Sequence, residues 1–280
     1  MPALAGGRLA RVSEFFAAAR DALRSLPGEA SAFACDLDGR ELFCERADEL
    51  FPAASVIKLP LVMALYADAA RGHIDLEERL PVGDRIDGSG VLRHLRDVET
   101  SSLRDLAMLA IIVSDNTATN RLIERFGIAR VNERMREWGC PHSLLARAMF
   151  DFEAAKRGHE NVMTARETAA LLLRLMRGEC EGRAASDAVL ALLAQCQDRS
   201  MLRRYLPHGA KVAHKTGTLD ESRNDAGIIT GEPTIVVAGF TRRLRDTEAA
   251  VSWLGVLGWC AYRAAGHEGA PLPPELVRTA

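Results

Sequence analysis

The chain has 280 residues, with 36 Lys and Arg against 38 Asp and Glu, so its formal net charge is −2. This balance argues against a nucleic-acid coat protein or a polybasic membrane binder, because both need a strong basic excess. Apolar residues make up 48% of the chain and charged residues 26%, a composition typical of folded rather than disordered proteins. At this length we expect one large domain or two interlocked ones.

The apolar segments predict neither a membrane span nor an export signal. The longest apolar stretch, Ala249 to Tyr262, is shorter than the roughly 20 residues that a transmembrane helix needs. Charged residues interrupt the N-terminus, where apolar residues from Leu9 to Leu23 recur at helical spacing and predict an amphipathic helix. We therefore expect a cytoplasmic location for the sequence as it stands, and a periplasmic or secreted one if an export segment was removed.

The six cysteines do not predict a metal site or a disulfide framework. They lie at positions 35, 44, 140, 180, 196 and 260. None form a C-x-x-C pair, and no histidine lies at ligand spacing beside them. We expect buried thiols. The sequence also has no Gly-rich nucleotide loop, and we expect neither a metal nor a cofactor.

The first half of the chain opens with a predicted β-hairpin and continues as helices. Short apolar runs at Ser31–Cys35 and Glu41–Cys44 flank Asp38-Gly39, a strong hairpin signal. A helix is predicted from about Ser55 to Gly72, and helical periodicity then continues to about residue 205. The further helices are expected at Leu103–Val113, Thr117–Phe126, Ile128–Trp138, from the capping box Thr164–Glu167 to before Gly178, and at Ala188–Cys196.

Strand signals return near the C-terminus. They lie at Lys211–His214, Ala226–Ile229 and Thr234–Phe240, and a final helix follows. The order of elements predicts an α/β (α+β) fold, with one antiparallel sheet flanked by helices from both chain ends and an inserted all-helical domain. We assign residues 1–60 and 205–280 to the α/β domain and 61–204 to the helical one.

The basic residues are almost all arginines, and the exceptions are informative. Of 36 basic residues only four are lysines: Lys58, Lys156, Lys211 and Lys215. A lysine can lose its proton at accessible cost, whereas an arginine effectively cannot. The positions of the lysines therefore point to places where a neutral amine is useful.

Ser55 and Lys58 lie three residues apart at the start of a predicted helix, so both side chains share one face. A serine hydroxyl is a poor nucleophile until a base takes its proton, and a neutral lysine can be that base. Burial and nearby cations lower a lysine pKa in the required direction. The N–H groups at the helix start can stabilise an oxyanion. Alone, such a pair also arises by chance.

Ser114-Asp115-Asn116 lies between two predicted helices. The ordinary interpretation is a helix cap, since these residue types are the commonest N-caps. The functional interpretation is that the Ser114 hydroxyl relays a proton to a leaving nitrogen, while the Asn116 amide orients a substrate carbonyl.

Lys215-Thr216-Gly217-Thr218 ends a predicted strand. The ordinary interpretation is a strand end with a turn. Functionally, Lys215 could hold a substrate carboxylate and keep the first lysine neutral. Gly217 would let a ligand approach the backbone. The N–H of Thr218 could complete a two-donor oxyanion hole with the N–H of Ser55.

Together the three motifs occur once each, in order, at a helix start, an interhelix junction and a strand end. In them the sequence resembles the penicillin-recognising serine hydrolases, that is, class A β-lactamases and their DD-peptidase relatives, which carry S-x-x-K, S-D-N and K-T-G elements. The resemblance covers the chain from about residue 30 onward. It implies an active site at the seam of two domains and hydrolysis of a β-lactam or peptide-like substrate through a Ser55 acyl-enzyme.

The resemblance also implies roles for less certain residues. Thr216 would help to bind the substrate carboxylate, and Arg223 is the nearest candidate for a second carboxylate clamp. The Glu-x-x-Leu-Asn element, whose Glu activates the water that releases the acyl-enzyme in class A enzymes, is absent. In the corresponding stretch Asp151 or Glu153 could substitute, or could form a salt bridge or cap. We expect slow β-lactam turnover or a long-lived adduct.

Three alternatives stay open. One is a DD-peptidase, penicillin-binding or esterase relative with slow deacylation, and another is a catalytically inactive relative that binds peptides or a partner. The third is a helix-turn-helix DNA-binding module over residues 116–139, with Arg130, Arg134 and Arg136 facing phosphates. Glu133 on the same helix and the slightly negative net charge oppose it. We expect no nucleic-acid partner and a monomer.

Overall fold

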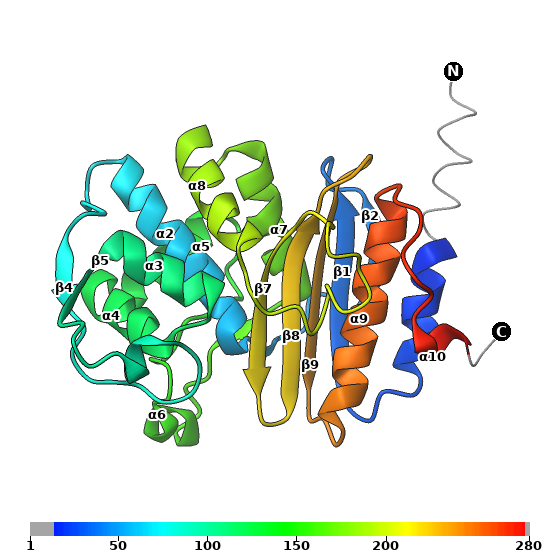
Figure 1. The fold of residues 1–280 in the computed structure, drawn as a ribbon, viewed down its shortest axis with the longest axis horizontal. Coiled ribbons are helices and arrows are strands. Elements are labelled where there is room, and N and C mark those ends of the chain that lie inside the picture. Colours follow the sequence, from blue (N-terminus) through cyan, green and yellow to red (C-terminus); the bar gives the residue numbers. More distant parts are fainter. Residues whose placement is uncertain (1–13, 278–280) are drawn as a thin grey trace.

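One antiparallel sheet joins the two ends of the chain. The structure, a computed structural model, describes residues 14–277. Its five-stranded sheet has the order β2-β1-β9-β8-β7 (Figure 1). The strands are β1 (Glu29–Asp36), β2 (Glu41–Glu45), β7 (Val212–Leu219), β8 (Ser222–Ile229) and β9 (Ile235–Arg242). Because β1 pairs with β9, the N-terminal hairpin and the C-terminal meander form one sheet, which confirms the predicted fold class.

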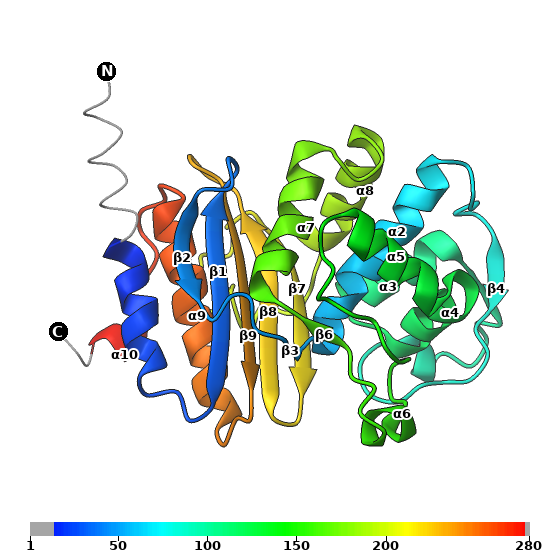
Figure 2. The same cartoon turned by 180° about the vertical axis from the view of Figure 1, so that it is seen from behind.

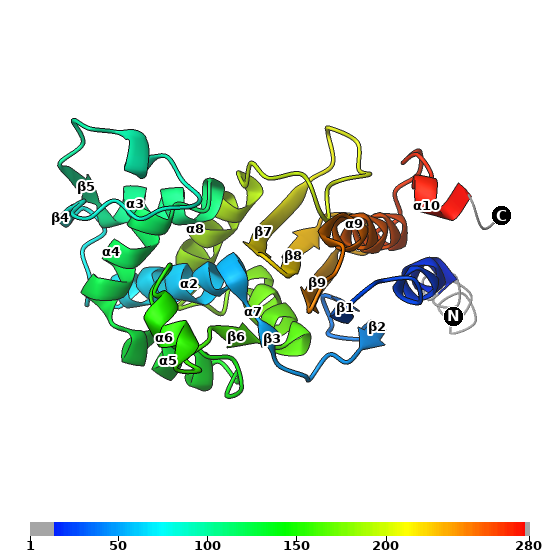
Figure 3. The same ribbon diagram turned by 90° about the horizontal axis from the view of Figure 1, so that it is seen from below.

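Helices cover both faces of this sheet. On one face lie α9 (Thr247–Ala264) and the N-terminal helix, described over 14–23, where Phe16 is buried and Trp253 Nε1 donates to the carbonyl of Ala19 at 3.1 Å. The part of the predicted amphipathic helix before residue 14 lies outside the described residues. On the opposite face lie α7 (Ala165–Arg177) and α8 (Arg183–Ala194) (Figures 2 and 3). The sheet is therefore the middle layer of a sandwich.

The helical part of the chain is inserted between β2 and β7. Its elements are β3 (Phe51–Pro52), the 3₁₀ helix η1 (Ala54–Ile57), α2 (Lys58–Ala70), β4 (Arg79–Pro81), the 3₁₀ helix η2 (Leu92–His94), β5 (Thr100–Ser102), α3 (Leu103–Ile112), α4 (Asn116–Phe126), α5 (Ile128–Glu137), α6 (Phe152–Lys156), β6 (Val162–Met163), α7 (Ala165–Arg177) and α8 (Arg183–Ala194). A short α10 (Pro274–Val277) ends the described chain. β3 pairs with β6 and β4 with β5.

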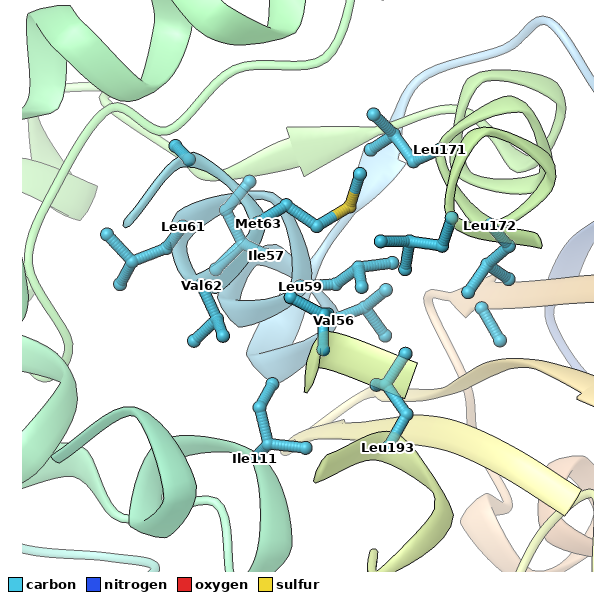
Figure 4. Close-up of a cluster of buried hydrophobic side chains, with 14 of the residues drawn as sticks. Val56, Ile57, Leu59, Leu61, Val62, Met63, Ile111, Leu171, Leu172 and Leu193 are labelled. Carbon is cyan, nitrogen blue, oxygen red and sulfur yellow. The ribbon is translucent and has the colours of Figure 1, made fainter. Parts of the chain in front are cut away.

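α2 is the central helix of this part. Every residue from 58 to 68 is buried, as expected for a helix that is apolar all around. Figure 4 shows side chains of η1 and α2 among Ile111 of α3, Leu171 and Leu172 of α7, and Leu193 of α8. This packing fixes the start of α2, where the first sequence motif lies, against both the sheet and the neighbouring helices.

Local turn and cap signals predicted the elements well. The hairpin turns at Gly39, and the helices end at glycines 72, 127 and 178, all with positive φ. The Thr164 hydroxyl accepts from the Glu167 N–H at 3.1 Å and caps α7 as expected.

The largest boundary differences from the sequence-based expectation lie in α8, β7 and β8. β8 begins at Ser222 rather than at Ala226. α8 begins at Arg183 rather than at Ala188. β7 continues to Leu219, because Gly217 and Thr218 still pair with residues of β8 before the chain turns. The Lys215-Thr216-Gly217 motif therefore lies inside a strand and not at its end.

Several broad features bear on the class of site. All six cysteines are free thiols, five of them buried. Among the described residues, no three His, Cys, Asp or Glu side chains cluster closely enough to hold a metal ion. Over residues 14–277 no helix combines the length and apolar character needed to cross a bilayer.

Candidate active site

The first motif lies where η1 passes into α2. Ser55 is half-buried in the 3₁₀ turn, and the preceding Ala54 has a φ of 47°, a left-handed conformation that costs energy outside glycine. Lys58 begins α2 and is fully buried. Its Nζ donates to the Ser114 carbonyl at 2.8 Å and to Asn116 Oδ1 at 2.8 Å, and lies 3.2 Å from Ser114 Oγ. The first and second motifs therefore meet through Lys58.

The second motif combines a cap with a strained serine. Asp115 caps α4 by accepting from the Ala118 N–H at 2.9 Å, so the cap interpretation is correct for this residue. Its other carboxylate oxygen accepts from the N–H groups of Val91 and Leu92 at 2.7 and 2.8 Å. Ser114 itself has a φ of 55°. Such strain persists only where surrounding contacts enforce it, and Ser114 contacts Lys58 through both its carbonyl and its Oγ.

The third motif brings a second lysine to the same hydroxyl. Lys215 lies on β7, is fully buried, and its Nζ donates to Ser114 Oγ at 3.1 Å and to the Thr216 carbonyl at 2.8 Å. Ser114 Oγ is therefore within hydrogen-bond distance of the Nζ atoms of both Lys58 and Lys215. A hydroxyl between two amines can accept a proton from one side and donate on the other.

The environment favours the neutral form of Lys58. Burial, and after it the positive charge of Lys215, lower the pKa of Lys58 well below its usual value, while Asp115 acts in the opposite direction. Burial also lowers the pKa of Lys215, although Cys196, then Asp225 and Asp198, oppose that shift. Lys58 is therefore suited to accept a proton near neutral pH.

Gly217 lets β7 lie directly against the turn that carries Ser55. A Cβ at position 217 would lie 3.0 Å from the Ala53 carbonyl oxygen, the Ala54 Cβ and the Ser55 nitrogen. Because β7 is an edge strand of the sheet, its outer backbone faces this turn rather than another strand. A substrate amide could align along this edge.

Two pockets meet at Ser55 and Thr218. The first, of about 360 Å³, is lined by Ser55, Ser114, Lys215 to Thr218, Cys196 and Asp198, among others. The second, of about 630 Å³, also contains Ser55 and Thr218 and is lined further by Asn116, Met149, Phe150, Phe152 and Glu160. The motif residues other than Lys58 and Asp115, which are buried, thus line these two adjoining pockets.

Comparison with known proteins agrees with this geometry. A family model described as the β-lactamase enzyme family matches residues 14–265. The chain belongs to the β-lactamase enzyme family. The β-lactamase BRO-1 of Moraxella catarrhalis is 26% identical over 204 residues, which cover 70% of this chain and 64% of that protein. The match thus spans less than two thirds of this curated relative.

Solved structures of relatives share the whole fold. A β-lactamase from Sphaerobacter thermophilus has a TM-score of 0.82 at 34% identity and covers 90% of this chain and 97% of its own. A mutant of PBP-A in an acyl-enzyme complex with penicillin G has a TM-score of 0.80 at 26% identity and covers 91% of this chain and 96% of its own.

Within this family's fold, the segment before α7 is held by buried asparagines that sequence reasoning missed. Asn120 and Asn132 each accept from one backbone N–H of the segment, Asn161 accepts from two, and each of the three donates to one backbone carbonyl, at 2.7 to 3.1 Å. The Asn161 carbonyl also accepts from the Ala53 N–H at 2.7 Å. This contact connects the segment to the turn that carries Ser55.

The structure does not bring Asp151 or Glu153 to the cleft. Asp151 accepts from the Ala154 N–H at 2.9 Å and caps α6, while Glu153 is exposed and pairs with Lys156 at 2.8 Å. Neither lines either pocket beside Ser55. Asp151 is therefore a helix cap and Glu153 is part of a surface salt bridge, which are the non-catalytic roles that the sequence also allowed. Both residues are exposed at the short α6.

Arg223 is also turned away from the motif residues. Its guanidinium donates to the carbonyls of Leu219, the last residue of β7, and Ser222, the first residue of β8. It lines neither of the two pockets. The structure therefore brings Lys215, Thr216 and Gly217 together with the serines but leaves Arg223 outside.

Two of the three arginines that the helix-turn-helix alternative assigns to phosphate contacts form ion pairs within the protein. Arg134 is fully buried and pairs with Asp68 of α2, and Arg130 pairs with the same carboxylate at 3.0 Å. These two side chains cannot face phosphates while they bind Asp68. The DNA-binding interpretation of α4 and α5 is therefore wrong for Arg130 and Arg134; Arg136 is exposed.

Proposed function

We propose that the protein is a class A-like serine β-lactamase, which opens β-lactam amides through an acyl-enzyme on Ser55. The observation that carries this proposal is the pair of lysine amines, from Lys58 and Lys215, within hydrogen-bond distance of Ser114 Oγ. The Ser114 side chain and Ser55 line the same pocket. These contacts support a site in which Ser55 is the nucleophile, Lys58 the base and Ser114 the proton relay.

Acylation follows from the residues present. Ser55 Oγ attacks the lactam carbonyl carbon while Lys58 Nζ takes the hydroxyl proton. The N–H groups of Ser55 and Thr218 stabilise the oxyanion. The C–N bond then breaks, and Ser114 passes a proton, replaced from Lys58, to the leaving nitrogen. The product is an ester at Ser55 with the ring opened.

Residues of β7 and of the junction between α3 and α4 orient the substrate in this proposal. Lys215 and Thr216 bind the substrate carboxylate, Gly217 lets the acyl group lie against β7, and the Asn116 amide orients the substrate carbonyl. The Asn116 Oδ1 accepts from Lys58 at 2.8 Å and its Nδ2 donates to the Asp87 carbonyl at 2.8 Å, so the second N–H of Nδ2 is the donor for a substrate carbonyl. Arg223 would reach the carboxylate only after leaving the two carbonyls that accept from it.

Deacylation is the slow step in this proposal. The second pocket beside Ser55 is lined by Met149, Phe150 and Phe152, and its loop carboxylate Glu160 is held by Arg147 at 2.9 Å. Asp151 and Glu153 do not line it. A water that attacks the ester needs a base, and the described loop supplies no carboxylate that is both close and unpaired.

Steady-state hydrolysis of a chromogenic cephalosporin tests the proposal. The wild type should release one equivalent of chromophore rapidly and then turn over slowly. The site has the nucleophile, base and proton relay that acylation needs, but the described loop has no close, unpaired carboxylate to activate the water for deacylation. Ser55→Ala should abolish both phases while retaining a cooperative thermal transition. Equal rates for the two proteins would contradict the role of Ser55.

The pairing of the loop carboxylate Glu160 with Arg147 also favours a related function. A penicillin-binding relative of the DD-peptidase type would form the same acyl-enzyme but not release it. The PBP-A relative captured as an acyl-enzyme with penicillin G supports this second candidate. A burst of one equivalent with no later turnover would favour it over the β-lactamase.

A further inference from the structure

A second nucleophile lies in the same pocket as Ser55. Cys196 follows the end of α8, is only 4% exposed, and lines the 360 Å³ pocket together with Ser55 and Lys215. Behind it, His214 of β7 and Asp225 of β8 are both fully buried. The proposed acylation uses none of these three side chains.

The histidine is held in one orientation by Asp225. His214 Nδ1 lies 3.0 Å from Asp225 Oδ1 and 3.1 Å from Oδ2. The carboxylate is itself anchored, since its Oδ2 accepts from the Leu202 N–H at 3.0 Å. Because a carboxylate only accepts, Nδ1 carries a proton, and the acceptor function of the neutral ring lies on Nε2.

The other ring nitrogen has no hydrogen-bond partner of its own. Within the described chain, His214 Nε2 is buried without one, and Cys196 is, after Asp225, the side chain whose interaction with His214 raises the pKa of the imidazole. A thiol, an imidazole and a carboxylate in this order form the arrangement that activates nucleophilic cysteines. A buried ring nitrogen with no other partner is available for the thiol proton.

Cys196 differs from the other buried cysteines. At positions 35, 140, 180 and 260, burial raises the pKa of the thiol to about 12. Burial acts in the same direction on Cys196, but His214 and then Lys215 outweigh it and lower the pKa of this thiol. Burial lowers the pKa of His214, yet Asp225 and Cys196 outweigh that effect and raise it to about 10. The shared proton therefore favours the imidazole.

We propose that Cys196 is a thiol-modification site inside the active-site pocket, where it forms mixed disulfides with small disulfide compounds. The adduct would occupy the space in front of Ser55 and Lys215 and block access to Ser55. The modification itself is independent of the β-lactamase proposal. Only the blocking of acylation rests on that proposed function.

The exchange step balances without a further oxidant. His214 Nε2 takes the thiol proton, and the Cys196 sulfur attacks one sulfur of the small disulfide. The new S–S bond forms as the old one breaks, and the departing thiolate takes up the proton held on His214. The net change is one thiol and one disulfide converted into a mixed disulfide and a small thiol.

The test measures thiol modification on the folded, full-length protein with 5,5′-dithiobis(2-nitrobenzoate), followed by peptide mass mapping. We expect the first equivalent to react about tenfold or more faster than the remaining cysteines, with the adduct on Cys196. Cys196→Ser should lose this fast phase. Cys44→Ser, a matched control at the least buried cysteine, should keep it.

The proposal is overturned if the fast phase persists in Cys196→Ser or if mapping places the first adduct on Cys44. Methyl methanethiosulfonate, which is small and uncharged, repeats the test without an anionic probe. If neither probe modifies Cys196 faster than Cys44, the site does not exist in solution.

The pH dependence of Cys196 modification tests the role of His214 as a positioning residue and proton acceptor. His214→Gln keeps Cys196 but removes the proton acceptor, so the modification rate at Cys196 should rise only as the pH approaches the ordinary thiol pKa, whose reference value is 9.0. A purely structural role would leave the pH profile of the modification unchanged. A thermal transition like that of the wild type shows that the variant is folded.

Blocking is measured on protein carrying one equivalent of adduct. Acylation of modified wild type by penicillin G should be lost and should return after reduction with dithiothreitol. Cys196→Ser, treated identically, should keep the rate of its own untreated sample. Acylation by modified wild type at the untreated rate contradicts blocking. If untreated wild type is not acylated, the β-lactamase proposal fails, while thiol mapping still decides whether Cys196 is modified.

Discussion

At the scale of single residues, the site depends on two lysines whose surroundings give them different roles. Both Lys58 and Lys215 are fully buried and both contact Ser114 Oγ. Lys58 also has Lys215 as a nearby cation, whereas Lys215 has the acidic groups of Cys196, Asp225 and Asp198 nearby. The acidic groups favour a charged Lys215, and that charge favours a neutral Lys58.

Removal of the charge at 215 should change the pH profile of acylation. Acylation needs neutral Lys58, so its rate falls as the pH drops through the pKa of Lys58. Because Lys215 lowers that pKa, Lys215→Gln should raise it and move the acid limb of acylation to higher pH. The measurement is the acylation rate by penicillin G as a function of pH.

The pH at which the acylation rate falls is measured separately from the absolute rate. In Lys215→Gln the absolute rate also falls, because carboxylate binding is lost. Lys211→Gln, just before the same strand, is the matched control and should leave the limb in place. An unchanged limb in Lys215→Gln would show that the two lysines are not electrostatically coupled.

The sequence predicted the motif residues that meet at Ser114, but not the other side chains around the pocket. Ser55, Lys58 and Lys215 belong to short local motifs, so their chemistry can be read without a fold. The group of Cys196, His214 and Asp225 comes from a helix end and two strands, and no local spacing marks it. Asp151 and Glu153 were predicted from their position in a loop, but the direction of a loop side chain depends on tertiary contacts.

At the scale of elements, the contact between β7 and η1 sets the shape of the cleft. The two elements approach so closely at Gly217 that a Cβ there would lie 3.0 Å from three atoms of residues 53–55. Such a contact requires a shift of the neighbouring backbone. The position of the Ser55 turn relative to the strand therefore depends on the absence of a side chain.

Gly217→Ala should reduce acylation by about tenfold or more, because a small displacement of a nucleophile has large kinetic effects. We expect a loss of unfolding free energy of about 1–3 kcal/mol. Penicillin acylation rates and urea unfolding measure the two effects. Gly209→Ala, where a Cβ would meet nothing within 4 Å, is the control. Equal acylation rates in the two variants would rule out a role for this contact.

The loop before α7 should depend on its asparagines. Asn161 accepts from the Ala146 and Arg147 N–H groups and donates to the Arg147 carbonyl, at 2.7 to 3.1 Å. Asn161→Ala leaves these groups unsatisfied and should cost about 2–4 kcal/mol of unfolding free energy, measured by urea denaturation.

Lys156→Ala in the same loop is the control, since the exposed pair with Glu153 should contribute little. Similar denaturation midpoints for both variants would mean that the Asn161 contacts do not hold the loop.

Element boundaries were predicted where a single residue decides them. Glycines in left-handed conformations end several helices, and Thr164 caps α7, as the sequence indicated. The end of β7 was placed too early, because Lys215 to Thr218 look like a turn and only pairing with β8 keeps them extended. Strand length depends on partners that sequence alone does not show.

At the scale of the whole molecule, a buried ion pair joins the central helix to the helical layer around it. Asp68 of α2 binds Arg130 of α5 at 3.0 Å and also binds Arg134, whose side chain is fully buried. A basic helix face that suggests phosphate contacts in the sequence is therefore used internally. The sequence could not show this, because Asp68 is remote in the chain.

Asp68→Asn should destabilise the fold by about 3–5 kcal/mol, because it leaves the buried Arg134 charge without its main counterion. Urea denaturation with tryptophan fluorescence measures the loss. Asp187→Asn removes an exposed pair with Arg183 and should change the midpoint little. A smaller loss in Asp68→Asn than in this control would contradict the account of the helical layer.

The intact mass of the protein after brief exposure to penicillin G tests the central claim most directly. The claim predicts that wild type gains the mass of one whole penicillin molecule, since ring opening loses no atoms, and that Ser55→Ala gains none. A folded wild-type sample with no mass gain at any time, or an adduct of equal yield in Ser55→Ala, would contradict it.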